Sequence, residues 1–229
     1  MITVFKKKEE LFFILLLLLH CASIGMGWNL PGFITKLSLV PYLLLLLYLF
    51  SRKQRLQLSP LPILALLFSF VGDLALSFTG ELSFLFGMGA FMLTHIFNAR
   101  YFWKLQKNSH ASIFSRMLAA LLMILVSATI FMALAPYLGK LTYPIIIYMG
   151  LISVMAVLAL GTIEADAVKQ IGTYCFIPGA LLFVLSDALL ALNRFVLHKT
   201  VFAVLVMLTY GMAQFFLVRG YGRATARDL

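Results

Sequence analysis

The sequence predicts an all-α membrane protein, and two properties of the chain support this prediction. Hydrophobic residues make up 63% of the 229 residues and charged residues only 11%, with a mean hydropathy of +1.04. Soluble domains are ordinarily about half apolar. The apolar residues also gather in blocks of about 17 to 22, the length of helix that crosses a bilayer. Membrane β-barrels show short alternating segments instead, so strands are not expected.

Eight apolar blocks can be read along the chain, and we expect each to form a transmembrane helix. They cover residues 11–27, 33–50, 60–79, 82–103, 113–134, 143–163, 172–192 and 200–218. The connections are short and contain turn residues, so we expect one transmembrane domain over residues 1–229. The first block begins like a signal peptide, but its apolar run is too long, and we expect it to be retained as a helix.

The basic residues predict how the helices are oriented. If the blocks cross alternately, 14 of the 18 Lys and Arg residues fall on the side of the N-terminus, and only Lys36, Lys140, Arg194 and Lys199 fall on the other. Cytoplasmic loops carry the excess of Lys and Arg, so both termini are expected in the cytoplasm, with the chain in a bacterial-type inner membrane. The net charge of +10 therefore belongs to these loops and does not indicate nucleic-acid binding.

Two pairs of similar segments indicate an internal duplication. The stretch "FVGDLAL" at 70–76 resembles "VLSDALL" at 184–190, and "MLTH" at 92–95 resembles "MLTY" at 207–210. The two pairs have nearly the same offset along the chain, which favours two parallel repeats of four helices, at 1–105 and 106–229. The alternative is chance similarity within a leucine-rich sequence.

Four polar residues are expected at one depth in the outer half of the membrane. At about 1.5 Å of rise per residue, Lys36, Asp73, Tyr148 and Asp187 reach similar depths from four different helices. Ionisable residues inside a membrane are costly and are functional candidates. Two neighbouring carboxylates share protons unequally, which supplies a general acid beside a general base, so we assign catalysis to Asp73 and Asp187. The alternative, a structural ion pair with Lys36, accounts for only one of them.

Other polar residues complete the candidate site. A deeper set is predicted to form the floor of the same cavity or, alternatively, to join helices by hydrogen bonds. A further pair follows the seventh block, where a guanidinium suits a lipid phosphate, although Arg194 is also placed to anchor the chain at the membrane surface. The deeper set is His95, Asn98, Tyr210 and Gln214, and the pair at the outer mouth is Asn193 and Arg194.

Other chemistries find no support in the sequence. It contains no G-x-S-x-G, H-E-x-x-H or Walker motif. Its four histidines are dispersed, and Cys21 and Cys175 lie in apolar blocks. We therefore expect no metal, no cofactor and no disulfide.

Four segments resemble the YhhN-type lysoplasmalogenase family over nearly the whole chain. They are "GDLAL" (72–76), "FLFGMGAFMLTHIF" (84–97), "GALLFVLSDALLALNRF" (179–195) and "YGMAQFF" (210–216). The resemblance implies hydrolysis of the vinyl ether bond of a lysoplasmalogen, which yields a fatty aldehyde and glycerophosphoethanolamine or glycerophosphocholine. Asp73 and Asp187 match the two intramembrane aspartates of the family, and Lys36 matches a lysine early in its second helix.

The sequence thus leaves two hypotheses about function. The first is a hydrolase that acts on a lysophospholipid among membrane lipids, with the aspartate pair as acid and base. The alternative is a small-molecule or proton-coupled transporter that uses the same buried aspartates. Neither hypothesis determines the oligomeric state.

Overall fold

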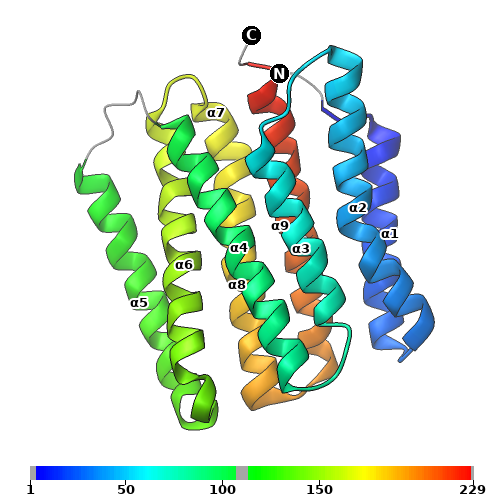
Figure 1. Cartoon of the computed structure of the whole chain (residues 1–229), viewed down its shortest axis with the longest axis vertical. Helices are drawn as coiled ribbons and strands as arrows, with labels where there is room; N and C mark the ends of the chain where they lie inside the picture. The colour runs from blue at the N-terminus through cyan, green and yellow to red at the C-terminus, as the bar shows by residue number, and fades with distance from the viewer. Residues whose placement is uncertain (1–3, 107–112, 228–229) are drawn as a thin grey trace.

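A computed structural model describes residues 4–106 and 113–227, and in these residues all regular structure is helical, so the all-α prediction is confirmed. The main helices run up and down one bundle (Figure 1). They are α1 (Lys7–Gly25), α2 (Asn29–Gln54), α3 (Pro60–Ala75), α4 (Glu81–Leu105), α5 (Ile113–Leu138), α6 (Thr142–Gly161), the short α7 (Lys169–Ile171), α8 (Ile177–Leu192) and α9 (Thr200–Thr225).

Five runs of the described residues are long and apolar enough to cross a membrane, which corrects the predicted eight. The runs are Asn29–Gln54, Glu81–Leu105, Phe114–Glu164, Lys169–Leu197 and Thr200–Thr225. Each predicted block overlaps a helix, but α3 has only 16 residues, and α1 begins with charged residues, including Glu9 and Glu10. The 51-residue run contains both α5 and α6, which are joined by a 3₁₀ turn at Gly139–Leu141. The apolar blocks therefore predicted where the helices lie, but not how many of them cross the bilayer.

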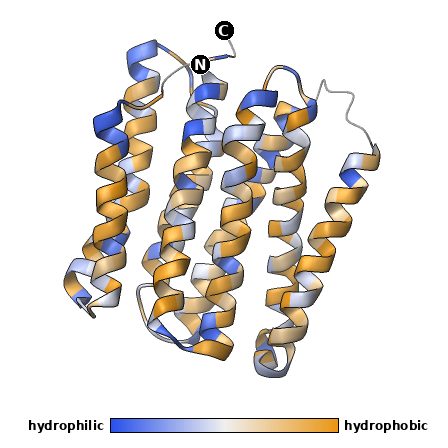
Figure 2. Cartoon of the chain, turned by 180° about the vertical axis from the view of Figure 1, so that it is seen from behind, coloured by the Kyte–Doolittle hydropathy of each residue, from blue (hydrophilic) through white to orange (hydrophobic). Residues whose placement is uncertain are grey.

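Most of the helices form a ring. In the order α1, α2, α3, α4, α6, α8 and α9, each packs against the next, and α9 returns to α1. Helix α5 lies at the edge of the bundle and packs on α6 and the lower part of α8 (Figure 1). Hydrophobic residues cover the middle of the helices, and many of the hydrophilic ones lie near the ends (Figure 2). The chain is therefore an integral, multi-pass membrane protein.

Both described ends of the chain lie at the same end of the bundle (Figure 1). This agrees with the side to which most basic residues are assigned, although Lys107, one of them, lies outside the described residues. The cytoplasmic orientation of that end stays a prediction.

The helix contacts follow a similar order in the two halves of the chain. Helices α1 and α2 pack together as α5 and α6 do, and α3 packs on α4 as α8 packs on α9. The crossed contacts also correspond, because α2 meets α9 while α6 meets α4. This agreement supports the proposal of two parallel repeats. The halves differ at α1, which packs on α9 and closes the ring, whereas α5 stays outside.

A cluster of aromatic side chains holds α4, α8 and α9 together near the terminal end. The Phe176 ring is fully buried, and its centre lies 5.0 Å from that of Phe102 and 6.1 Å from that of Tyr221.

Phe176 ends a π-helical segment, Gly172–Phe176, directly before Ile177 and Pro178 begin α8. On α9, Gly220 allows this ring to approach the backbone, because an added Cβ would overlap the ring of Phe176.

We predict that Gly220→Ala destabilises the protein by about 1–3 kcal/mol, because the buried Phe176 ring has no free space into which to move. Thermal unfolding in detergent measures the effect. The matched control is Gly89→Ala, because an added Cβ at Gly89 meets nothing within 4 Å. Equal melting temperatures for the two variants would contradict this packing.

Candidate functional site

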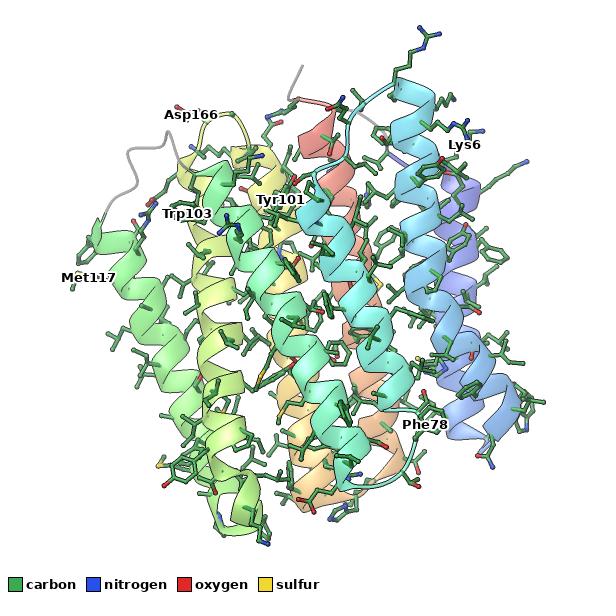
Figure 3. The ribbon with its side chains drawn as sticks, viewed as in Figure 1. Lys6, Phe78, Tyr101, Trp103, Met117 and Asp166 are labelled. Atoms are coloured by element: carbon green, nitrogen blue, oxygen red, sulfur yellow. The ribbon has the colours of Figure 1, made fainter. Side chains whose placement is uncertain are left out.

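Asp73 lies near the end of α3 and is almost completely buried. Its side chain is held where α3 meets α4, because Gly72 has no Cβ and lets the Phe91 ring pack closely. The Asp73 residue is only 3% exposed, and its Oδ2 accepts a 2.6 Å hydrogen bond from the Tyr210 hydroxyl on α9. Phe78, labelled in Figure 3, follows α3 and marks this end of the bundle, whereas Trp103 and Asp166 lie towards the other end.

Asp187 lies on α8 and receives two hydrogen-bond donors. The Tyr148 hydroxyl on α6 donates to Asp187 Oδ2 at 2.5 Å, and His95 Nε2 on α4 lies 3.2 Å from the same oxygen. His95 Nε2 is also 3.0 Å from the Tyr148 hydroxyl, so the three groups form one small network. Both contacts use Oδ2, which leaves Oδ1 of Asp187 as the oxygen available to a ligand.

The two aspartates have equivalent surroundings in the proposed repeats. His95 and Tyr210 occupy corresponding places in "MLTH" and "MLTY", and each contacts the aspartate of the other half. Tyr148 lies on α6 beside Asp187, and Lys36 lies on α2, the helix that corresponds to α6. Asp73 interacts electrostatically with both Lys36 and Asp187. The carboxylates are therefore close enough to influence each other.

The structural ion pair that the sequence offered as an alternative is absent from the described residues. No nitrogen–oxygen contact within 4.0 Å joins Lys36 to either aspartate. Asp73 instead takes its hydrogen bond from a phenol, and the Lys36 ammonium acts on it from farther away. Lys36 thus keeps its charge available to a ligand.

A small apolar cavity of about 70 Å³ opens beside Asp187. The Asp187 side chain, which is 13% exposed, is its acidic wall, and Tyr148 is another polar group on it. The rest of the wall comes mainly from α4, α5, α6 and α8, including Phe84, Met88, Phe91, Ile130, Leu134, Ile145, Met149, Val184, Leu190 and Phe195. An apolar chain that enters this cavity therefore comes into contact with a carboxylate.

A larger and more polar cavity of about 780 Å³ lies between α1, α2 and the ends of α3, α8 and α9. Its lining includes His20, Ser23, Trp28, Asn29, Phe33, Lys36, Ser77, Leu190 and Asn193. Leu190 lines both cavities, so only its side chain and its neighbours separate the polar space from the apolar one. Lys36 connects the polar cavity electrostatically to Asp73.

The deeper set predicted as a cavity floor makes hydrogen bonds between helices, which was the alternative given for it. His95 and Tyr210 contact the aspartates directly. Gln214 donates to the Ser69 hydroxyl at 2.9 Å, one turn of α3 before Asp73, so it supports the helix that carries the carboxylate. Asn98 lies apart from the aspartates and accepts a 2.6 Å bond from the Tyr221 hydroxyl.

The two residues predicted at the outer mouth separate. Asn193 lines the polar cavity, but its Oδ1 also accepts a 2.8 Å bond from the Lys199 backbone and caps the turn after α8. Arg194 lines neither of the two cavities. Its exposed guanidinium lies 5.1 Å above the centre of the Phe84 ring, a cation–π contact that holds it on the outside of α4. Its contact with a lipid phosphate stays a prediction, as does its alternative role as an anchor at the membrane surface.

Sequence reasoning missed three polar residues near the site. Ser69 and Thr94 lie 3.2 Å apart between α3 and α4, and His20 lies in the wall of the polar cavity. The sequence did contain a signal for these three residues, because polar side chains within apolar helices face the interior of a bundle. No group of three or more His, Cys, Asp or Glu side chains that would hold a metal ion occurs in the part of the chain that the structure describes.

The fold and the site together define a class, a polytopic helical membrane protein with two aspartates inside its bundle, one of which lines an apolar cavity. Residues 32–221 match the YhhN family, and the chain belongs to that family. It is distantly related to lysoplasmalogenases of Mycobacterium bovis and Mycobacterium tuberculosis, each 30% identical to it over 160 residues. The match covers 69% of this chain and 58% of each relative's length. No solved structure matches the chain.

We predict that Tyr210→Phe lowers stability by about 1–3 kcal/mol, because it leaves the buried Asp73 carboxyl without its hydrogen-bond donor. Tyr143→Phe is the control, since Tyr143 is 79% exposed. Thermal unfolding of both variants in detergent, with and without Asp73→Asn, measures the coupling. If the Tyr210 and Asp73 substitutions act additively, the hydrogen bond does not stabilise the fold.

Proposed function

We propose that this protein hydrolyses the vinyl ether bond of a lysoplasmalogen. The observation that supports this most directly is the Asp187 carboxylate in the wall of an apolar cavity that shares Leu190 with a more polar one. The distant relationship to lysoplasmalogenases agrees with it.

The two cavities suit an amphiphilic substrate. The apolar cavity beside Asp187 accepts the alkenyl chain, and the polar cavity beside Lys36 accepts the glycerophospho head group. A lysoplasmalogen carries its vinyl ether oxygen at the junction of chain and head group. With each part in the cavity that matches its polarity, the vinyl ether lies near Leu190, on the side of the apolar cavity that Asp187 lines.

The proposed reaction needs only a proton and a water molecule. One carboxylic acid delivers its proton to the β carbon of the vinyl ether, and the C=C bond becomes a C–C bond beside an oxocarbenium ion. The second carboxylate stabilises this cation and takes a proton from the water that adds to it. When the resulting hemiacetal collapses, the carboxyl that took the proton from water gives it to the departing glycerol oxygen, and the other carboxylate takes the hydroxyl proton. A fatty aldehyde and an alcohol are released, and the pair holds one proton as at the start.

Asp187 is the aspartate that contacts the substrate in this proposal. It lines the apolar cavity, and its Oδ1 is left available because Tyr148 and His95 both contact Oδ2. These two side chains act as positioning residues that fix the carboxylate plane. Asp73 is nearly buried, interacts with Asp187, and completes the pair from the opposite half of the chain.

We predict that Asp73→Asn and Asp187→Asn each lower aldehyde release at least about 100-fold, because each removes one partner of the acid–base pair. The measurement is aldehyde formation from lysoplasmalogen by purified protein in detergent. Asp166→Asn, at the opposite end of the bundle and exposed, retains activity. Full turnover by either site variant contradicts the mechanism.

The same assay separates hydrolysis from transport. Purified protein in detergent has no membrane gradient, so a transporter releases no aldehyde under these conditions. Absence of product from the folded wild-type protein, together with substrate uptake in vesicles, favours the transporter.

The apolar cavity continues into a groove along the outside of the bundle. This groove, of about 670 Å³, lies between α5 and α6 and is lined by Ala120, Met123, Ser127, Ala128, Met149, Gly150, Ser153 and Val157, among others. Ser127 and Met149 line both the groove and the cavity beside Asp187. Because the inner cavity is small, we propose that the rest of a long alkenyl chain lies in this groove.

We predict that Gly150→Leu selectively impairs long-chain substrates. Gly150 lines the groove and an added Cβ there meets nothing within 4 Å, so a larger side chain has free space at its root and occupies the groove. The expected result is a severalfold higher KM for long-chain lysoplasmalogen and little change for a short-chain analogue. Gly89→Leu, equally free of contacts but outside the groove, serves as control. An unchanged chain-length preference means that the tail lies elsewhere.

A further inference from the structure

We propose that His20 binds the ammonium group of an ethanolamine head group in the polar cavity and selects ethanolamine over choline lipids. The inference rests on the proposed function and specifies its substrate. It starts from a buried atom that nothing else in the site explains. His20 is 2% exposed and lines the cavity, yet its Nε2 has no hydrogen-bond partner among the described residues.

The neighbours of His20 fix the proton on its other nitrogen. Nδ1 lies 3.0 Å from the Thr35 hydroxyl, whose single proton is already donated to the Pro31 carbonyl at 2.7 Å. With that proton on the Pro31 carbonyl, the hydroxyl is an acceptor for Nδ1–H, and we take this tautomer in the proposal. A neutral imidazole with its proton on Nδ1 presents Nε2 as a lone-pair acceptor. Nε2 therefore accepts a hydrogen bond from an N–H or O–H donor of a ligand.

The rest of the cavity suits a zwitterion. Lys36 supplies a cation on one part of the wall, where a phosphate of the head group gains a charged partner. Ser23 lines the same space, and its hydroxyl donates to the Leu19 carbonyl at 2.8 Å, so its lone pairs also face outward as acceptors. No acidic residue is among those that line this cavity. The wall of the polar cavity therefore presents neutral hydrogen-bond acceptors to an ammonium group.

The ethanolamine and choline head groups differ in the number of N–H donors on the cationic nitrogen. The ammonium of ethanolamine has three N–H donors, whereas the quaternary ammonium of choline has none. Choline instead needs several aromatic faces around it. Only the ethanolamine form satisfies His20 Nε2, and a buried polar atom without a partner is costly.

The experiment compares kcat and KM for the ethanolamine and choline lysoplasmalogens with the same alkenyl chain. The wild-type protein is expected to favour the ethanolamine form about tenfold in kcat/KM, as a hydrogen bond to a charged group implies. His20→Phe is expected to raise KM for the ethanolamine form by that factor and to leave the choline form within about twofold. His20→Gln, whose amide oxygen is also an acceptor, is expected to restore part of the preference.

Leu18→Phe provides the matched control, because it introduces the same ring on α1 at a position that faces outward and is 51% exposed. It is expected to leave both substrates unaffected. An equal loss for both head groups in His20→Phe overturns the proposal, because His20 then contacts a group that the two lipids share. A wild-type preference for the choline form also overturns the proposal. It indicates that the aromatic rings of Trp28 and Phe33 bind the head group in this cavity.

A binding measurement separates this inference from the proposed reaction. Lysophosphatidylethanolamine and lysophosphatidylcholine have an ester in place of the vinyl ether, so they test recognition without hydrolysis. The former is expected to raise the melting temperature of the wild-type protein more than the latter, and His20→Phe is expected to remove the difference. If this holds while no aldehyde forms from lysoplasmalogen, the reaction is wrong and the head-group site stands. Equal stabilisation by both lipids rejects the site.

Discussion

The site depends on two carboxylates that lie inside a bundle of apolar helices. A carboxylate removed from water needs donors or cations around it, because nothing else in a hydrocarbon environment replaces its hydration. Here the donors come from distant parts of the chain, with Tyr210 of α9 on Asp73 and Tyr148 and His95 on Asp187. The hydrogen bonds therefore constrain how α3, α4, α6, α8 and α9 approach one another.

Asp73 and Asp187 have similar surroundings, so the differences between these surroundings distinguish the two aspartates. Asp73 is closed off and has the Lys36 ammonium within electrostatic range, whereas Asp187 borders a cavity and shares its Oδ2 between two ring systems. In the proposed repeats, the two half-sites are therefore similar but not identical. The polar cavity lies on the Lys36 side and the apolar cavity on the Tyr148 side, an arrangement that matches the two ends of an amphiphilic lipid.

Helix α5 accounts for much of the difference between the halves. Its counterpart α1 packs against α9 and seals the ring, but α5 remains outside and covers the apolar cavity through Ile130 and Leu134. This position creates the groove along α6 that reaches the cavity at Ser127 and Met149. In the proposed function, the same displacement gives a lipid chain a route from the bilayer to Asp187.

The all-α membrane class, the location of the helices and the choice of Asp73 and Asp187 as candidate site residues all follow from the sequence alone. Composition and apolar block length carry that information, because burial in lipid constrains every residue of a helix. The number of spanning runs was predicted less well, since α3 is apolar but has only 16 residues, and a short turn joins α5 and α6 into one apolar run.

The contacts between polar groups follow from the packing of the helices in three dimensions. Depth along a helix predicts one layer for Lys36, Tyr148 and the aspartates, but depth does not say which way a side chain faces. Rotation about the helix axis brings His95 to Asp187, turns Arg194 onto Phe84, and leaves His20 Nε2 unpaired in the wall of a cavity. Those rotations are set by packing between helices far apart in the sequence, so one-dimensional patterns do not contain them.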